Sequence, residues 1–209
     1  MYKRQLSKLP VVGSGDPLDL AALEAGIAEL EAAMTTMAES SRRSATAAAK
    51  RSSQHARVEA QRILNVKIAA DDFRIPQAIQ DFTDLGVFRM RKIAEAQAVS
   101  IRGAIAAHTE GSLRADILHT LWVSRVRSQA IARDQVYGLH AEVLRAWSLA
   151  GGSETFVWHT RHDERVRAGH QRLDGKTFRW DTPPDTGGGE GHGLPGTPHG
   201  CRCSAIPVE

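Results

Sequence analysis

The sequence predicts a mainly α protein with long helices, followed by a small, loop-rich α+β module of short antiparallel strands at its C-terminal end. Alanine and arginine, which favour helices, are abundant, whereas aromatic residues make up only 5% of the 209 residues. Apolar residues recur at helical spacing as far as Leu149. After Gly152 the pattern changes to short alternating runs separated by glycine and proline, which is typical of strands and turns.

The N-terminal part is expected to be an arm followed by a helical region. Residues 1–15 show no periodicity and are predicted to form a flexible arm, and residues 16–110 form the helical region. The first helix should begin near Asp16 or Asp19, where a carboxylate can accept hydrogen bonds from free amides. Its apolar residues alternate at spacings of three and four: Leu20, Leu23, Ile27, Leu30, Met34 and Met37. Such a narrow heptad stripe needs a partner helix.

The stripe fades between Ser40 and Ser53, where either a continued helix or a break at Ser52-Ser53 fits the sequence. Three more helical stretches are expected, over residues 57–72, 76–108 and 113–149. Gly86 is a candidate interruption within the second of these. The Gly151-Gly152 pair is a strong stop signal for the last helix.

Residues 111–209 are predicted to form the second domain, with the loop-rich module over residues 152–209. A strand is expected over 155–160, because alternation places Phe156 and Trp158 on one face. Weaker strand candidates lie at 177–180 and 204–208, and the Gly/Pro-rich segment 182–198 should form no regular element. Three tryptophans are expected to fill the small core of this part: Trp147, Trp158 and Trp180.

Charge is unevenly distributed, although the formal net charge is only +3. Six acidic residues and no basic one lie between Asp16 and Glu39, whereas seven basic residues and one acidic residue lie between Arg42 and Lys67. The basic stretch supports a hypothesis of contact with DNA phosphates, which would weaken with salt. The residues proposed for this contact are Arg42, Arg43, Lys50, Arg51 and Arg57. A solvated helix face is the alternative interpretation.

No targeting signal and no apolar run long enough to cross a membrane occurs, so the protein is expected to be made and used in a cytoplasm. The two cysteines, Cys201 and Cys203, are separated by one residue. A disulfide across so small a ring would be strained, which leaves free thiols or metal ligands as the better interpretations.

The segment from Trp158 to Cys203 concentrates the metal-ligand types: His159, His162, Asp163, His170, His192, His199, Cys201 and Cys203. A module with so few apolar residues often needs a stabilising ion, and zinc takes nitrogen and sulfur ligands. The His-x-Cys-x-Cys run at 199–203 offers three ligands, and His170 is the chosen fourth. Against zinc, isolated histidines are commonly solvated, and the cysteines lack the two-residue gap of zinc knuckles.

Four runs occur in a specific order: Phe156-Val157-Trp158-His159-Thr160, Asp163-Glu164-Arg165-Val166-Arg167, Leu173-Asp174-Gly175-Lys176, and Pro198-His199-Gly200-Cys201-Arg202-Cys203. Together they resemble the signature of the phage Mu protein F-like head morphogenesis family, over about residues 113–208. The positions that correspond to the family motif are Trp158, Asp163, Arg165, Asp174, Gly175 and Arg202. Many relatives carry a Cys-x-x-Cys pair after the Asp-x-Arg turn, where this chain has Arg167 and His170.

The resemblance implies a minor capsid protein of a tailed phage, associated with the portal or the capsid and acting in head assembly, DNA packaging or ejection. It implies no enzyme and no small-molecule substrate. The expected partners are the portal protein and the major capsid protein. The expected locations are the virion (capsid interior or portal vertex) and, during assembly, the host cytoplasm. A zinc ion held by His170, His199, Cys201 and Cys203 would be structural. The alternative function is a metal-dependent nuclease-like protein that processes DNA.

Overall fold

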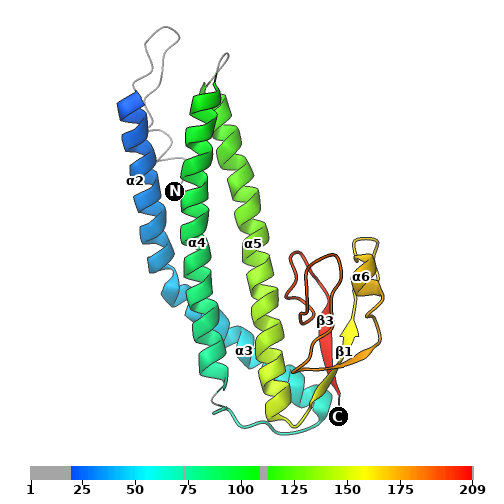
Figure 1. Ribbon diagram of the computed structural model, residues 1–209. Helices are drawn as coiled ribbons and strands as arrows, with labels where there is room; N and C mark the ends of the chain where they lie inside the picture. Colours follow the sequence, from blue (N-terminus) through cyan, green and yellow to red (C-terminus); the bar gives the residue numbers. More distant parts are fainter. Residues whose placement is uncertain (1–19, 73, 109–112, 209) are drawn as a thin grey trace. The chain divides into compact units, whose positions relative to one another are not determined.

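The computed structural model describes residues 20–72, 74–108 and 113–208 (Figure 1). The described part of the chain contains these elements in order: α2 (Leu20–Ser40), α3 (Arg42–Leu64), α4 (Arg74–Ala107), α5 (Leu113–Ala150), β1 (Thr155–His159), α6 (Ala168–Gln171), β2 (Thr177–Arg179) and β3 (Ser204–Val208). Long helices followed by a three-stranded antiparallel sheet confirm the predicted fold class. The predicted arm over residues 1–15 lies outside the described residues.

The chain divides into two compact units, and neither is continuous in sequence. One unit comprises Met1–Arg42 and Val87–Ser128, and the other comprises Arg43–Gly86 and Gln129–Glu209. Helices α4 and α5 each contribute to both units. The domain ranges 16–110 and 111–209 remain predictions. The two compact units are defined by contacts, and each combines two segments that are distant in sequence.

The first unit is a three-helix arrangement of α2 with parts of α4 and α5 (Figure 1). Its core contains Leu23 and Ile27 from α2, with Ala98, Ile101, Leu113, Ile117 and Leu121 from the other two helices. The stripe of α2 thus has the partners that it needs. Its register drifts toward the end of α2, where Ala38 is buried and Met37 is 46% exposed. The reason is that 3.6 residues per turn do not match a seven-residue repeat.

Helix α3 corrects two sequence predictions. It begins at Arg42 and ends at Leu64, so a start at residue 57 and an end at residue 72 are both wrong. Of the two possibilities for Ser52-Ser53, the structure confirms the continued helix and not the break. Asn65 has a φ of 51°, a left-handed conformation that asparagine tolerates and that commonly ends helices. The buried face consists mostly of small side chains: Ala49, Ser53, Ala56, Ala60 and Leu64. Small residues make close helix packing possible without a strong hydrophobic pattern.

Helices α4 and α5 agree with their predicted ranges to within two residues. The start of α4 is fixed by Asp72, whose carboxylate accepts a hydrogen bond from the Arg74 amide at 2.9 Å. Gly86 does not interrupt α4. A Cβ there would lie 3.9 Å from the Gln135 side chain, which is ordinary contact and requires no distortion. None of the helices in the described ranges combines the length and the apolar character that a membrane span needs.

In the second unit the sheet packs with α3 and α5 around one aromatic-rich core. The strand order is β2-β1-β3, with both pairs antiparallel. Phe156 and Trp158 alternate along β1 and are fully buried, as is Trp180 at 1% exposure. Trp147 on α5 is also buried, and its indole N–H donates to Ser53 Oγ on α3 at 3.0 Å. The three tryptophans therefore lie in the core, as predicted.

Candidate metal centre

The sheet brings the motif runs to one end of the C-terminal module. Trp158 of β1 exchanges backbone hydrogen bonds with the turn before β2: its N–H donates to Lys176 O at 2.9 Å, and its carbonyl accepts from Gly175 N–H at 2.8 Å. On its other side Trp158 pairs with Ala205 of β3. The end of β1 therefore lies beside the Leu-Asp-Gly turn and beside the residues that follow the closing Cys-x-Cys run.

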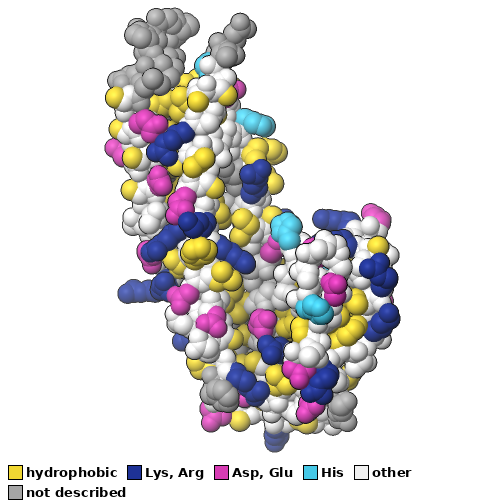
Figure 2. Space-filling view, in the orientation of Figure 1, with side chains coloured by type: hydrophobic (Ala, Val, Ile, Leu, Met, Phe, Trp, Pro, Cys, Tyr) yellow, Lys and Arg dark blue, Asp and Glu magenta, His cyan; other side chains and the backbone are white. Residues whose placement is uncertain are grey.

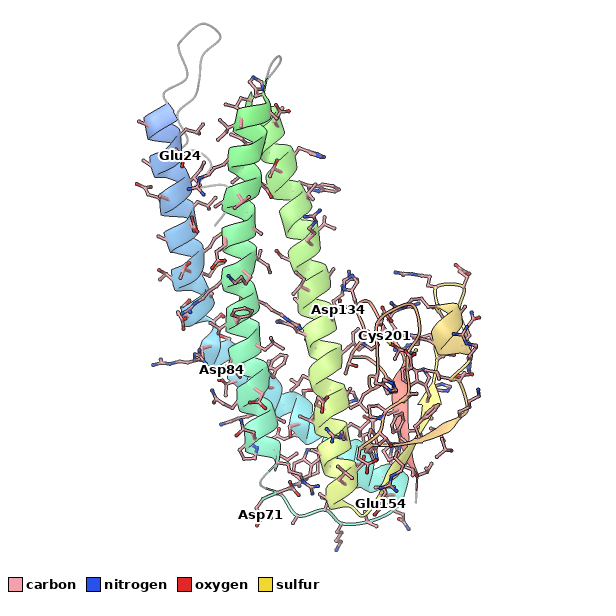
Figure 3. The ribbon with its side chains drawn as sticks, viewed as in Figure 1. Glu24, Asp71, Asp84, Asp134, Glu154 and Cys201 are labelled. Carbon is pink, nitrogen blue, oxygen red and sulfur yellow. The ribbon has the colours of Figure 1, made fainter. Side chains whose placement is uncertain are left out.

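Three of the four predicted metal ligands converge in the interior of this module. His170 lies on α6, and its Nδ1 is 3.5 Å from Cys201 Sγ and 3.6 Å from Cys203 Sγ. All three residues are buried. The edge of the imidazole meets the Trp158 ring at a centroid distance of 5.4 Å. Figure 3 labels Cys201 within the loops of the module.

The two thiols are unequal because they share a hydrogen bond. The pKa of Cys201 is lowered to about 6, chiefly by the hydrogen bond that it accepts from Cys203. The Gly196 amide also donates to Cys201 Sγ, at 3.3 Å. The hydrogen bond between the two thiols, together with burial, raises the pKa of Cys203. The lowered pKa favours the thiolate form of Cys201, which is the form in which cysteine binds metals.

The donor set fits zinc. Ligand atoms 2.0–2.3 Å from a tetrahedral zinc lie roughly 3.3–3.8 Å from one another. The two nitrogen–sulfur distances fall in that range, and the three ligand atoms all lie within 4.8 Å of one another. Among the described residues no fourth His, Cys, Asp or Glu ligand joins them. A cavity of about 20 Å³ beside the cluster has room for about one water-sized ligand.

The structure places the fourth predicted ligand, His199, outside this cluster. Its side chain is 80% exposed, and its Nδ1 lies 2.6 Å from Asp134 Oδ2 on α5. An extended segment would place residues 199, 201 and 203 on one side. Instead the chain turns here: Gly200 has a φ of 65°, and the Cys201 amide donates to Pro198 O at 2.9 Å. Asp134 is labelled in Figure 3 on the side of α5 next to the module.

The contact between Glu190 and His170 was not predicted from the sequence. Glu190 Oε2 lies 3.4 Å from Nε2 of His170, the ring nitrogen that does not face the thiols. Arg167 forms an ion pair with Glu190, and it also donates to His199 O at 2.6 Å. A carboxylate on the free nitrogen of a metal-binding imidazole is the usual way to fix its tautomer and orientation. The available signal was an acidic residue in a glycine-rich loop, which does not reveal its partner.

Gly169 allows that loop to approach α6. A Cβ at residue 169 would collide with the carbonyl oxygen of Thr186. Thr186 is itself held by a hydrogen bond from its hydroxyl to Gly191 O at 2.8 Å. The loop that carries Glu190 thus packs against the helix that carries His170 only because residue 169 has no side chain.

The remaining motif residues fix the turns around the cluster. Asp163 accepts hydrogen bonds from Arg202 Nη2 at 2.7 Å and from the Arg165 amide at 3.1 Å, and its pKa is lowered, mainly by Arg202. Asp174 accepts from the Thr160 amide at 2.7 Å, the largest cause of its lowered pKa. Gly175 has a φ of 72°, a conformation that glycine adopts at little cost. These contacts link the Asp-x-Arg turn to the closing run, and the Leu-Asp-Gly turn to β1.

The proposed DNA-contact residues lie on α3, away from this cluster in sequence. Arg43, Lys50 and Arg51 are exposed. Arg42 is 3.9 Å from Glu39, and the Arg57 guanidinium lies over the Trp147 ring at 5.7 Å. The latter two therefore have partners within the protein. On the face drawn in Figure 2, Lys and Arg side chains also surround the C-terminal module, with Asp and Glu among them.

Comparison with known proteins identifies the family. Residues 92–206 match the family described as Phage Mu protein F like protein. This range is more than half of the chain and includes the cluster, the motif turns, β1, β2 and the first part of β3. The chain therefore belongs to the phage Mu protein F-like family of phage head morphogenesis proteins. No curated protein and no solved structure matches the chain.

Proposed function

We propose that this chain is a minor capsid protein of a tailed phage that associates with the portal or the major capsid protein and acts in head assembly, DNA packaging or ejection. The observation that supports this proposal most directly is the family match over residues 92–206. The family is structural, and we propose no catalytic activity. The protein would be found in the host cytoplasm during assembly and in the virion afterwards, in the capsid interior or at the portal vertex.

The proposal is tested by co-expression with the portal and major capsid proteins of the same phage, followed by purification of the particles and portal rings. We expect the chain at a low, fixed number of copies in one of these fractions. Gly169→Ala, which places a Cβ against a carbonyl, should reduce incorporation, whereas Gly103→Ala, which meets no atom within 4 Å, should not. A chain that stays free while normal particles form contradicts the proposal. DNA cleavage with added Mg²⁺ or Mn²⁺ would then test the nuclease alternative.

We also propose that the exposed part of the basic stretch on α3 contacts packaged DNA through phosphates. Arg43 and Lys50 are seven residues apart and so share one helix face, and Arg51 adjoins them. Replacing these three residues by glutamine should weaken DNA binding and reduce its salt dependence by about one unit of slope per lost contact. Replacing Arg89, Arg91 and Lys92 on α4 removes the same charge and serves as the matched control. Equal losses in both variants would contradict a specific role for α3.

The third part of the proposal is a structural zinc ion held by His170, Cys201 and Cys203, with Glu190 orienting the imidazole. Metal analysis of the purified chain should find one zinc per chain that depends on the thiols, and the double variant Cys201→Ser/Cys203→Ser should lose it. His199→Ala distinguishes the two possible ligand sets: we expect it to retain zinc, because its side chain faces Asp134. If His199→Ala lost zinc as completely as His170→Ala, the four-ligand set would be right and the three-ligand set wrong. Absence of zinc from the unmodified chain would contradict both.

A further inference from the structure

A second group of potential ligands lies on the surface of the C-terminal module, with no residue in common with the buried cluster. His159 is the last residue of β1, His162 lies three residues later in an irregular segment, and Asp174 belongs to the Leu-Asp-Gly turn. The backbone pairing between Trp158 and the turn at residues 175–176 brings these positions together. One ligand atom from each of the three side chains lies within 4.8 Å of the others.

Each side chain of this group is held by an observed contact. Asp174 Oδ1 accepts the Thr160 amide at 2.7 Å, which leaves Oδ2 directed at His162 Nε2, also at 2.7 Å. The rings of His159 and His162 are nearly perpendicular, with centroids 5.0 Å apart. His162 has a φ of 54°, an uncommon conformation for a residue other than glycine. The segment after β1 therefore holds the His162 imidazole against Asp174 despite a backbone conformation that is disfavoured.

We propose that His159, His162 and Asp174 form an open binding site for a divalent first-row transition-metal ion such as Zn²⁺, Ni²⁺ or Co²⁺. Two imidazoles and one carboxylate are ligands that these ions accept readily. Three protein ligands leave coordination positions for water, as in zinc sites that keep an open position. The exposure of both histidines gives the ion direct access from solvent.

The surroundings leave room for those additional ligands. An open hollow of about 390 Å³ adjoins the site, and His162 and Asp174 are on its wall with Thr160, Asp163, Glu164 and Gln171. The polar side chains on its wall can hold water molecules that complete the shell of the ion. The site thus differs in kind from the buried thiol cluster: it is exposed, contains no sulfur and does not depend on that cluster or on the role in the phage head.

The test is Co²⁺ binding to the full chain without a polyhistidine tag, followed by equilibrium dialysis and by absorption spectroscopy. Thiolate-bound Co²⁺ absorbs strongly in the near ultraviolet, whereas imidazole- and carboxylate-bound Co²⁺ does not. We therefore expect one equivalent of Co²⁺ that adds no thiolate band, in addition to any ion at the cysteines. His159→Ala and His162→Ala should each weaken this binding by at least about tenfold, the lower bound for loss of even an outer partner of a metal site.

His192→Ala is the matched control, because His192 is an exposed histidine of the same module that bonds only to Pro183 O at 2.9 Å among the described contacts. It should leave Co²⁺ binding unchanged. Asp174→Asn is a further variant that keeps an acceptor for the Thr160 amide while removing the carboxylate, and it too should weaken binding. Thermal melting without metal checks that each variant is folded. If all bound Co²⁺ shows the thiolate band, or if both histidine variants that remain folded bind as well as His192→Ala, the site does not exist.

Discussion

The three-helix unit and the C-terminal module are stabilised in different ways. In the helical unit the core is a seam of aliphatic side chains such as Ile27 and Ile101, and the ion pairs lie outside it, for example Arg102–Glu24 at 3.0 Å. In the module a few large aromatic side chains are fully buried, and the turns are fixed by individual polar contacts. Helices satisfy their own backbone hydrogen bonds, so any apolar seam of suitable size supports them, whereas loops depend on specific side chains.

The largest effect is expected from Trp158→Ala in the module. Trp158 is fully buried, so its removal should lower the free energy of unfolding by about 3–5 kcal/mol, through lost burial and the cavity left behind. Chemical denaturation followed by circular dichroism measures it. The matched control is Trp122→Ala on α5, a residue that is 62% exposed and should change stability by no more than about 0.5 kcal/mol. Equal losses of unfolding free energy for both tryptophans would show that the buried aromatic core contributes no more to stability than an exposed side chain does.

A smaller loss is expected from Ile27→Ala in the helical unit. Ile27 is 2% exposed, but the same core cluster contains the small Ala98, so we expect the site to collapse in part. We expect a loss of about 2–3 kcal/mol, the lower part of the range for such substitutions. Val99→Ala, at a position 66% exposed, is the control in the same denaturation experiment. A loss larger than that of Trp158→Ala would reverse the comparison between the two regions.

Ser53→Ala tests a single polar contact in the second unit. It removes the acceptor of the buried Trp147 N–H, which should cost about 1–3 kcal/mol. Trp147→Phe removes the donor, so in that background Ser53→Ala should cost much less. The two single variants and the double variant form a thermodynamic cycle. Additive losses would mean that the hydrogen bond contributes nothing and that only packing is measured.

The smallest effect is an acid dependence of the motif turns. The pKa values of Asp163 and Asp174 are lowered from the ordinary 3.8, so folding favours their ionised forms. Their contribution to stability is therefore complete above about pH 4 and is lost as the pH falls through the lowered values. Because both carboxylates are partly exposed, the loss should be modest. Melting temperatures between pH 7 and pH 2.5 should fall less steeply in Asp163→Asn than in the unmodified chain. An unchanged slope would show that the Asp163–Arg202 pair is not linked to stability.

The sequence predictions were accurate where they depended on local signals, and they failed where the outcome depended on contacts between distant residues. The ends of α5 and the three strands were predicted well, since Gly151-Gly152 and the alternation at Phe156 and Trp158 are local signals. The start of α3 was predicted wrongly because its buried face is largely alanine and serine, which give no hydrophobic period. Met37 was placed in the stripe, but Ala38 is buried instead. At the candidate site, His170, Cys201 and Cys203 come together, whereas the turn at Gly200 directs His199 toward Asp134.

By itself the sequence determined the fold class, most of the element boundaries and the family, because periodicity, turn residues and ordered motifs are properties of short segments. Only the tertiary structure decided which ligands meet. Glu190 reaches His170 because the loop passes over Gly169, and His159 and His162 meet Asp174 because β1 pairs with the turn before β2. These contacts join residues from separate loops and strands. Their distances depend on how the whole module packs, and no local pattern in the chain encodes that.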